Sequence, residues 1–201
     1  MIRKLPLVPT LLVGLAVLTM IGLGIWQLGR AREKNALMAR YGAAQALPPT
    51  SFPTSPIAAD ALPLFRRATG FCLRVTSIRR TAGTNRQGET GFVHIAECST
   101  GAEGPGMAVQ MGWSKNPNAK VTWSGGPVSG IIAPDSKMRM RLVSEQGLGG
   151  LQPTARPSLQ SIPNNHRSYA VQWFLFAAIA LVIYMIALRQ RLTRQAAEPK
   201  P

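Results

Sequence analysis

The residues best suited to chemistry lie in the stretch Pro163 to Phe174, PNNHRSYAVQWF, which leads from a polar segment into a long apolar run. His166 is the candidate ligand, because an imidazole nitrogen binds haem iron and other metal ions. The side chain of Asn164 or Asn165 could cap the exposed N–H groups of a helix that starts here. The pattern therefore predicts a helix whose first turn carries a histidine at the depth of the lipid headgroups.

On that helix, His166, Tyr169, Ala170 and Trp173 would share one face, because they are spaced i, i+3, i+4 and i+7. An imidazole above a small alanine and two aromatic rings could form a wall for a flat macrocycle, with His166 as the axial iron ligand. Acidic groups on such a ligand need cations. Four are expected at the same boundary: Arg30, Arg32, Lys34 and Arg167.

An ordinary membrane anchor explains many of the same residues. Trp and Tyr are common at both boundaries of a membrane helix, and Arg and Lys are common just beyond them. Trp26 and Gln27 stand at the end of an earlier apolar run, and Gln172 stands inside the second one. The amides of Gln27 and Gln172 could hydrogen-bond between two helices. From the residues alone, a packed two-helix anchor and a cofactor site are both open.

Two apolar runs organise the chain. Val8 to Leu28 and Tyr169 to Leu188 are each long enough to cross about 30 Å of hydrocarbon as a helix. A cleaved signal peptide is the alternative for the first run, but it would have a shorter apolar core with a small-residue cleavage site close behind. Here Gly29 to Lys34, a basic cluster, follows instead. We therefore expect a retained anchor.

The predicted organisation follows from these runs and from composition. Residues 46–64 and 147–163 are rich in Pro, Gly, Ser and Thr and are expected to be linkers. The expected parts are a cytoplasmic tail (1–7), a first transmembrane helix (8–28), a juxtamembrane helix with a Pro-rich linker (29–64), a β-rich periplasmic domain (65–146), a second linker (147–165), a second transmembrane helix (166–188) and a second cytoplasmic tail (189–201). Both short tails are basic and long domains translocate largely regardless of charge, which favours tails inside and the domain outside.

The middle of the chain predicts a small antiparallel β-rich domain, either a barrel or a sandwich. Its runs are short, alternate in polarity and are separated by turn residues. In the first run we expect Phe71, Leu73 and Val75 on one face, with Arg74 and Thr76 on the other. The six expected strands are 70–78, 90–98, 107–113, 121–123, 126–132 and 138–143.

Charge and motifs narrow the function classes. The net charge is +15, but the basic residues are scattered and form no basic helix, so nucleic acid is not the expected partner, whereas anionic membrane lipids are. His94 lies within an expected strand and is interpreted as structural. The sequence lacks paired carboxylates, G-x-S-x-G, H-E-x-x-H and a phosphate-binding loop. We therefore expect no enzyme activity.

Cys72 and Cys98 are the two cysteines of the chain. They form no C-x-x-C-H motif, so covalent haem attachment is not encoded. In an oxidising compartment they could form a disulfide, and otherwise they would be two small buried apolar side chains. The sequence leaves both alternatives open.

In the stretches around Trp26 and His166, and nearly end to end, the sequence resembles the surfeit locus protein 1 family of cytochrome c oxidase assembly factors. Several matching elements are short: Gly70, Gly112-Trp113 and Val128-Ser129-Gly130. The first helix contributes Gly24-Ile25-Trp26-Gln27-Leu28 with Arg30 and Lys34. The most specific element is Pro163-Asn164-Asn165-His166 followed by Tyr169-Ala170 and Gln172-Trp173-Phe174.

The resemblance implies an assembly factor that binds or delivers haem a while the catalytic subunit of the oxidase matures, in contact with that subunit and with other haem a or oxidase assembly proteins. It places the protein in the bacterial inner membrane, or the mitochondrial inner membrane of a eukaryote. The alternative is a cofactor-free scaffold that stabilises an assembly intermediate. The implied cofactor-binding residues are His166, as the haem iron ligand, with Tyr169, Trp173, Trp26, Gln27, Arg30 and Arg167.

The sequence departs from the family pattern at two positions. Met111 stands before Gly112-Trp113 where the family commonly has Arg, and Arg167 follows His166 where the family has an apolar residue. The first departure changes the expected charge of the domain. The second adds a cation beside the candidate ligand.

Overall fold

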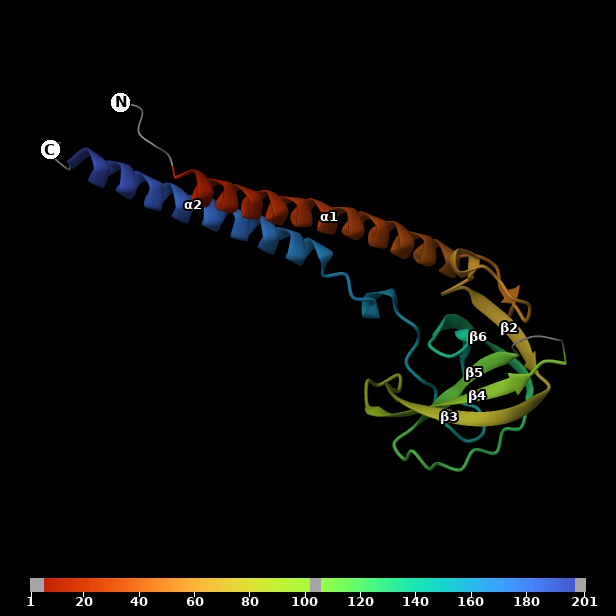
Figure 1. Cartoon of the computed structure of the whole chain (residues 1–201). Coiled ribbons are helices and arrows are strands. Elements are labelled where there is room, and N and C mark those ends of the chain that lie inside the picture. The colour runs from red at the N-terminus through yellow and green to blue at the C-terminus, as the bar shows by residue number, and fades with distance from the viewer. Residues whose placement is uncertain (1–5, 102–105, 198–201) are drawn as a thin grey trace. The chain divides into compact units, whose positions relative to one another are not determined.

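The computed structural model describes residues 6–101 and 106–197. It divides into two compact units, which are described separately. Residues 1–37 and 163–201 form the helical unit, and residues 38–162 form the barrel unit. Figure 1 shows the two long helices, α1 (Leu7–Gln45) and α2 (His166–Ala197), and the curled sheet. The expected fold class, a membrane-type helix pair with a β-rich domain, is confirmed.

Both helices are long and apolar enough to cross a membrane. α1 has 39 residues and α2 has 32, and the apolar part of each exceeds the roughly 20 residues that span a bilayer. α1 includes both the first apolar run and the short helical continuation expected after it. Large side chains such as Leu11, Leu15 and Ile183 are more than 60% exposed. Lipid is the environment in which a continuous apolar surface of this size is stable.

The barrel unit contains seven strands in one sheet. Their bounds are β1 (Thr50–Ser51), β2 (Arg67–Cys72), β3 (Arg74–Thr84), β4 (Thr90–Ser99), β5 (Met107–Ser114), β6 (Gly126–Asp135) and β7 (Arg139–Ser144). The strand order is β1-β2-β6-β7-β5-β4-β3. Leu73 alone separates β2 from β3, so the chain connects β3, at one end of this order, directly to β2, the strand next to β1 at the other end.

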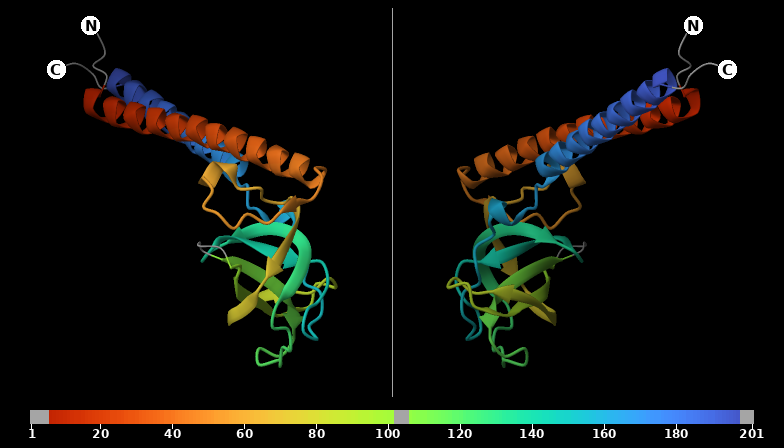
Figure 2. Two further views of the ribbon diagram at one scale, coloured as in Figure 1. Left: turned by 90° about the vertical axis from the view of Figure 1, so that its right-hand side faces the viewer. Right: turned by 90° about the vertical axis from the view of Figure 1, so that its left-hand side faces the viewer.

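The sheet is curled (Figure 2), and the chain turns at Leu73, the corner between β2 and β3. At this corner the N–H of Leu73 donates to the carbonyl oxygen of Ser99 on β4 (2.9 Å), and the N–H of Val75 donates to that of Ser124 (3.0 Å). The curled sheet encloses an apolar core. Its fully buried members include Cys72, Ala96, Val109, Met111, Ile132 and Leu142. The bends at this corner thus close the sheet into a barrel.

Three details of the sheet differ from the expectations. The expected strand at 121–123 is not paired as a strand, and the first expected run is divided into β2 and β3. Two strand pairs are parallel, β1 with β2 and β5 with β7, in an otherwise antiparallel sheet. The two parallel pairs were not expected because neither connection contains an α-helical crossover: only a short 3-10 helix lies between β1 and β2, and strand β6 lies between β5 and β7.

Phe71 and Leu73, two apolar residues of the first run, do not face the core. Phe71 and Leu73 are 57% and 60% exposed, whereas Cys72 between them is fully buried. Side chains alternate here, and the inward face carries Cys72, which is bonded to Cys98 on β4. The inward side chain of this segment is therefore the disulfide cysteine and not the larger apolar residues beside it.

The disulfide between Cys72 and Cys98 joins the β2–β3 corner to β4, across 26 residues of sequence. Both cysteines are buried within the barrel core. The bond settles the alternative that the sequence left open.

Replacing both cysteines by alanine should lower the free energy of unfolding by about 3 kcal/mol, because the open chain gains conformational entropy when unfolded. Denaturant unfolding of the full-length protein in detergent, followed by tryptophan fluorescence, measures this change. Reductant should destabilise the wild type by a similar amount and leave the double variant unchanged. Equal unfolding midpoints with and without reductant would show that the bond contributes nothing.

The buried carboxylate of Asp135 lies at the C-terminal end of β6. The side chain of Asp135 is completely inaccessible to solvent, and its Oδ1 accepts hydrogen bonds from Arg79 (2.5 Å) and Arg141 (3.1 Å). Its Oδ2 accepts from the backbone N–H groups of Lys137 (3.0 Å) and Met138 (2.9 Å). Burial by itself would raise the pKa of this carboxyl, but the four hydrogen bonds outweigh it and hold the pKa below the ordinary value. The β6–β7 turn is therefore organised around an ionised group.

Candidate functional site

The two helices of the helical unit meet along a seam of small residues. Gly24 and Ala31 are the buried residues of α1, and Ala170 and Ala177 are buried on α2. Each pair is seven residues apart, which places its members two turns apart on one helix face. A Cβ at Gly24 would lie 2.6 Å from the ring of Phe174, so glycine lets that ring pack against the α1 backbone. Small residues bring membrane helices close enough for side-chain hydrogen bonds to cross between them.

Three hydrogen bonds cross the seam, and their order along the two helices is antiparallel. Thr10 bonds to Tyr184 through their hydroxyl groups. The Oε1 atom of Gln27 lies 2.8 Å from Nδ1 of His166. Just before the start of α2, the Nδ2 of Asn164 donates to Oδ1 of Asn35 (2.8 Å). The last two pairs lie where the chain leaves the apolar run, so they form a polar cluster at one membrane boundary.

His166 is the first residue of α2 and is half-buried in this cluster. Its Nδ1 faces Gln27, while its Nε2 has no hydrogen-bond partner among the described residues and is accessible. The Oδ1 atom of Asn164 is buried and has no partner in the described part of the chain. Among the described residues, the cluster therefore has one buried acceptor without a partner, Oδ1 of Asn164, and one accessible ring nitrogen without a partner, Nε2 of His166.

The structure brings together only part of the predicted set. His166 and Gln27 are bonded directly, but Trp26 and Tyr169 are 57% and 50% exposed on the helix surface. Trp173 is half-buried and packs edge-to-face on Phe176, with ring centroids 6.3 Å apart. Trp26 and Tyr169 are therefore accessible at the surface of the helix pair and are not enclosed between the two helices.

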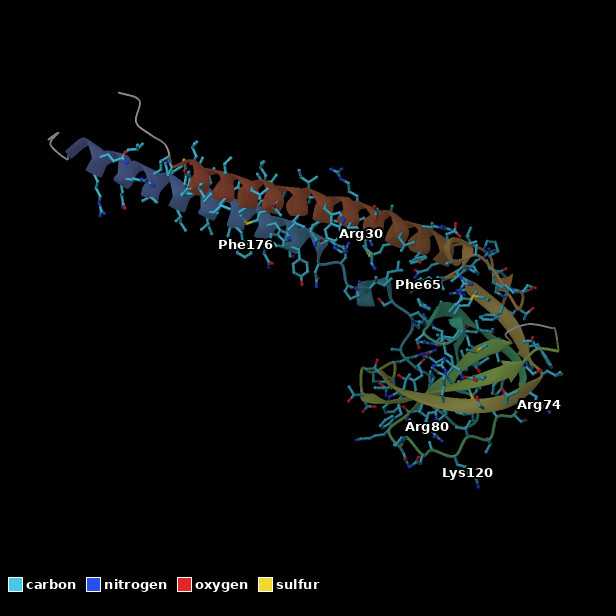
Figure 3. The ribbon with its side chains drawn as sticks, in the orientation of Figure 1. Arg30, Phe65, Arg74, Arg80, Lys120 and Phe176 are labelled. Atoms are coloured by element: carbon cyan, nitrogen blue, oxygen red, sulfur yellow. A yellow bond between two sulfur atoms is a disulfide. The ribbon has the colours of Figure 1, made fainter. Side chains whose placement is uncertain are left out.

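The two predicted cations differ in their surroundings. Arg30 on α1 (Figure 3) is exposed and forms an ion pair with Glu33 at 2.6 Å. Arg167 is exposed at the first turn of α2, beside His166. An exposed pair one turn apart on a helix contributes about 0.5 kcal/mol or less, so an acidic ligand group could replace Glu33 at little cost.

Two expectations for this stretch were wrong in detail. The amide of Gln27 bonds to His166, and Gln172 is exposed to the surroundings of the helix pair. Asn164, a candidate helix cap, uses its side-chain N–H on Asn35 instead. Sequence reasoning missed Asn35, although it lies eight residues after Gln27 and so on the same face of α1. Helical periodicity extended beyond the apolar run would have found it.

The barrel unit offers a different histidine. His94 is fully buried, and its Nε2 lies 3.0 Å from Oγ of Ser114. Desolvation and the nearby charge of Arg80 lower its pKa, so the ring is neutral. The described residues contain no group of three or more His, Cys, Asp or Glu side chains that could hold a metal ion. These facts agree with the structural interpretation of His94.

Basic residues of the barrel unit are spread over its surface. Arg74, Arg80 and Lys120 are exposed and lie at separate places on the unit (Figure 3). Arg79, Arg141 and Lys137 are instead paired with Asp135 or Glu97. Among the described residues of this unit, the exposed positive charges therefore form no continuous groove of the kind that follows a nucleic-acid backbone.

A comparison with protein-family models matches the SURF1 family over residues 14–178. The chain belongs to the SURF1 family. The match includes both helices' contributions to the polar cluster, from Gln27 to Asn35 and from Asn164 to Trp173. A search of curated proteins returned no match.

SURF1 proteins are cytochrome c oxidase assembly factors and are not a known enzyme class. Membership therefore associates this chain with assembly of the oxidase. Its most family-specific stretch, Pro163 to Phe174, contains both His166 of the polar cluster and Phe174 of the seam. In this SURF1 protein, residues that pack the helix pair and residues that are candidates for ligand binding thus alternate along the first turns of α2.

Proposed function

We propose that this protein binds haem a during assembly of cytochrome c oxidase, with His166 as the ligand to the haem iron. One observation carries the proposal: a half-buried imidazole at the membrane boundary has one nitrogen held by Gln27 and the other without a partner among the described residues. A haem supplies an iron that accepts a lone pair from such a nitrogen.

The surroundings of His166 fit the other parts of a haem. Trp26 and Tyr169 offer exposed aromatic surface to an apolar ring, and Trp173, four residues after Tyr169 on α2, is half-buried. Arg30 and Arg167 are exposed cations able to pair with propionates. The buried Oδ1 of Asn164 is a hydrogen-bond acceptor. Its donor could be a protonated propionate, or a water molecule bound to a ligand that carries a formyl group. All of these residues belong to the helical unit.

We also propose that the barrel unit faces the periplasm, or the intermembrane space of a mitochondrion, with both termini on the opposite side of the inner membrane. The buried disulfide supports this placement, because such bonds form in oxidising compartments. Basic residues on the two tails, Arg3 with Lys4 and Arg189 with Arg191, agree with the positive-inside rule.

The test is the absorption spectrum of the full-length protein purified from cells that synthesise haem a. Wild type should carry a Soret band, and the haem content per protein of His166→Ala should fall by about 100-fold or more, because the loss of an iron ligand exceeds the roughly 10- to 100-fold effect of losing a supporting residue. Gln172→Ala is the matched control, since Gln172 is on the same helix but exposed. An equal haem content in His166→Ala would exclude this histidine as a ligand.

A second candidate function is a cofactor-free scaffold that holds an oxidase subunit through protein contacts. The observation that favours it is the seam itself, because three hydrogen bonds and four buried small residues already give these polar groups a packing role. This function predicts that the catalytic subunit co-purifies with His166→Ala as well as with wild type, and that neither preparation is pigmented.

A further inference from the structure

The two nitrogens of the His166 ring have different surroundings. Nδ1 lies 2.8 Å from Oε1 of Gln27, whereas Nε2 is accessible and has no partner among the described residues. An amide oxygen only accepts hydrogen bonds, so the ring nitrogen that faces it carries the proton. In the neutral imidazole the lone pair then resides on Nε2. This is the less common tautomer of a free histidine side chain.

The position of Gln27 is fixed by its neighbours on α1. It lies between Gly24 and Ala31, which are buried in the seam. Before Gln27 along α1, the ring of Phe174 packs against Gly24, and after it Asn35 accepts a hydrogen bond from Asn164. Because packing on both sides fixes the helix register, the Gln27 amide reaches the His166 ring at a defined height.

We propose that Gln27 is a positioning residue that holds His166 as the Nδ1–H tautomer, so that Nε2 is directed to the iron. This inference rests on the proposed function for the identity of the ligand, but the hold on the ring exists without it. A hydrogen bond from Nδ1–H to an acceptor makes a histidine a stronger metal ligand and fixes its orientation. Gln27 therefore acts through His166 and does not itself touch the iron.

The tautomer can be read directly in the protein without cofactor. The chain has two histidines, so a sample labelled with ¹⁵N in histidine gives signals from His94 and His166 alone. At the basic end of a pH series, where imidazoles are neutral, the nitrogen shifts identify the protonated atom. His166→Ala assigns the two rings. Wild type should show His166 protonated at Nδ1, with Nε2 as the bare nitrogen.

Gln27→Leu preserves the size and apolar packing of the side chain but removes the acceptor. In this variant we expect His166 to shift to the Nε2–H form or to a mixture of the two forms. Gln172→Leu is the matched control, because it removes an amide from an exposed site of the same unit, and it should leave the tautomer unchanged. A wild-type ring protonated at Nε2, or a ring unaffected by Gln27→Leu, would overturn the proposal.

Haem titration provides the second measurement. Gln27→Leu should bind haem about 10- to 100-fold more weakly than wild type, the range found when a supporting hydrogen bond to a ligating histidine is lost. Gln27→Glu keeps an acceptor of the same length and should restore most of the affinity. Equal affinities in wild type and Gln27→Leu would contradict a role toward the iron.

The two measurements separate the inference from the function on which it rests. If wild type shows the Nδ1–H tautomer, loses it in Gln27→Leu and yet binds no haem, the proposed cofactor is wrong while the hold of Gln27 on His166 stands. If haem binds through His166 but Gln27→Leu changes neither tautomer nor affinity, the function stands and the role assigned to Gln27 is wrong.

Discussion

Gly130→Ala should destabilise the barrel unit by about 4 kcal/mol or more, one of the largest effects expected from any single methyl group in this chain. Gly130 lies in β6, the strand between β2 and β7, opposite Ser144 in the β6–β7 ladder. A Cβ built at this position overlaps the carbonyl oxygen of Val143 and lies 2.7 Å from its carbonyl carbon. Both obstructing atoms belong to the backbone, so relief requires the two strands to separate.

Denaturant unfolding of the full-length protein in detergent measures the loss, and the expected variant is either unfolded at the outset or unfolds at a much lower denaturant concentration. Gly42→Ala is the matched control. Gly42 is helical, and a Cβ there would meet only Leu159, at 3.8 Å. That substitution should be neutral or stabilising by roughly 0.5–1 kcal/mol, because alanine favours helix. Similar midpoints for the two variants would refute the close approach at Gly130.

Asp135→Ala should cost about 3–5 kcal/mol, because removal of one partner from a buried ion pair leaves uncompensated charge. Arg79 and Arg141 would lose their shared carboxylate, and the backbone N–H groups of Lys137 and Met138 would lose their acceptor. Asp135→Asn should be intermediate, since one carbonyl oxygen can satisfy part of this set. Thermal or denaturant unfolding measures the series.

The same carboxylate predicts the response of stability to acid. Its pKa is lowered in the folded protein, so its stabilising contribution is complete above the ordinary carboxyl value near 3.8. As pH falls through that value toward the lower folded pKa, the unfolded state takes up a proton first and the contribution is lost. Wild type should therefore lose more stability than Asp135→Asn below about pH 4. Asp60→Asn, at an exposed site, is the control and should follow the wild-type curve. Parallel acid profiles for wild type and Asp135→Asn would contradict the assignment.

Much of the fold could be predicted because local signals coincided with the final structure. The apolar runs around Leu15 and Ile179 determine α1 and α2 by length alone, and five of the short β-forming runs became strands. The closure of the barrel could not be predicted, since it depends on the break at Leu73 and on the parallel pairing of Val109 with Leu142. Such pairings join residues distant in sequence and leave no periodic signal.

The candidate site shows the same division. The chemistry of His166 and its place at the start of α2 followed from the sequence, but the partner of its ring did not. Gln27 was recognised as a polar residue at the boundary, and its contact depends on the helix register set by Gly24 and Phe174. The departure at Met111 also has a structural reason, because this side chain is fully buried in the barrel core, where an apolar group fits and a charged one would not.

The antiparallel pairing of α1 and α2 has a consequence for the order of events during synthesis. The 120 residues between Gln45 and His166 must be made after α1 and before α2. At about 5–20 residues per second this takes on the order of ten seconds. Throughout that interval the side chains of Thr10, Gln27 and Asn35 are without the partners that Asn164 and α2 later supply. A newly inserted α1 therefore exposes unpaired polar side chains. Until α2 of the same chain has been made, another membrane helix with a suitable hydrogen-bonding group can bind there.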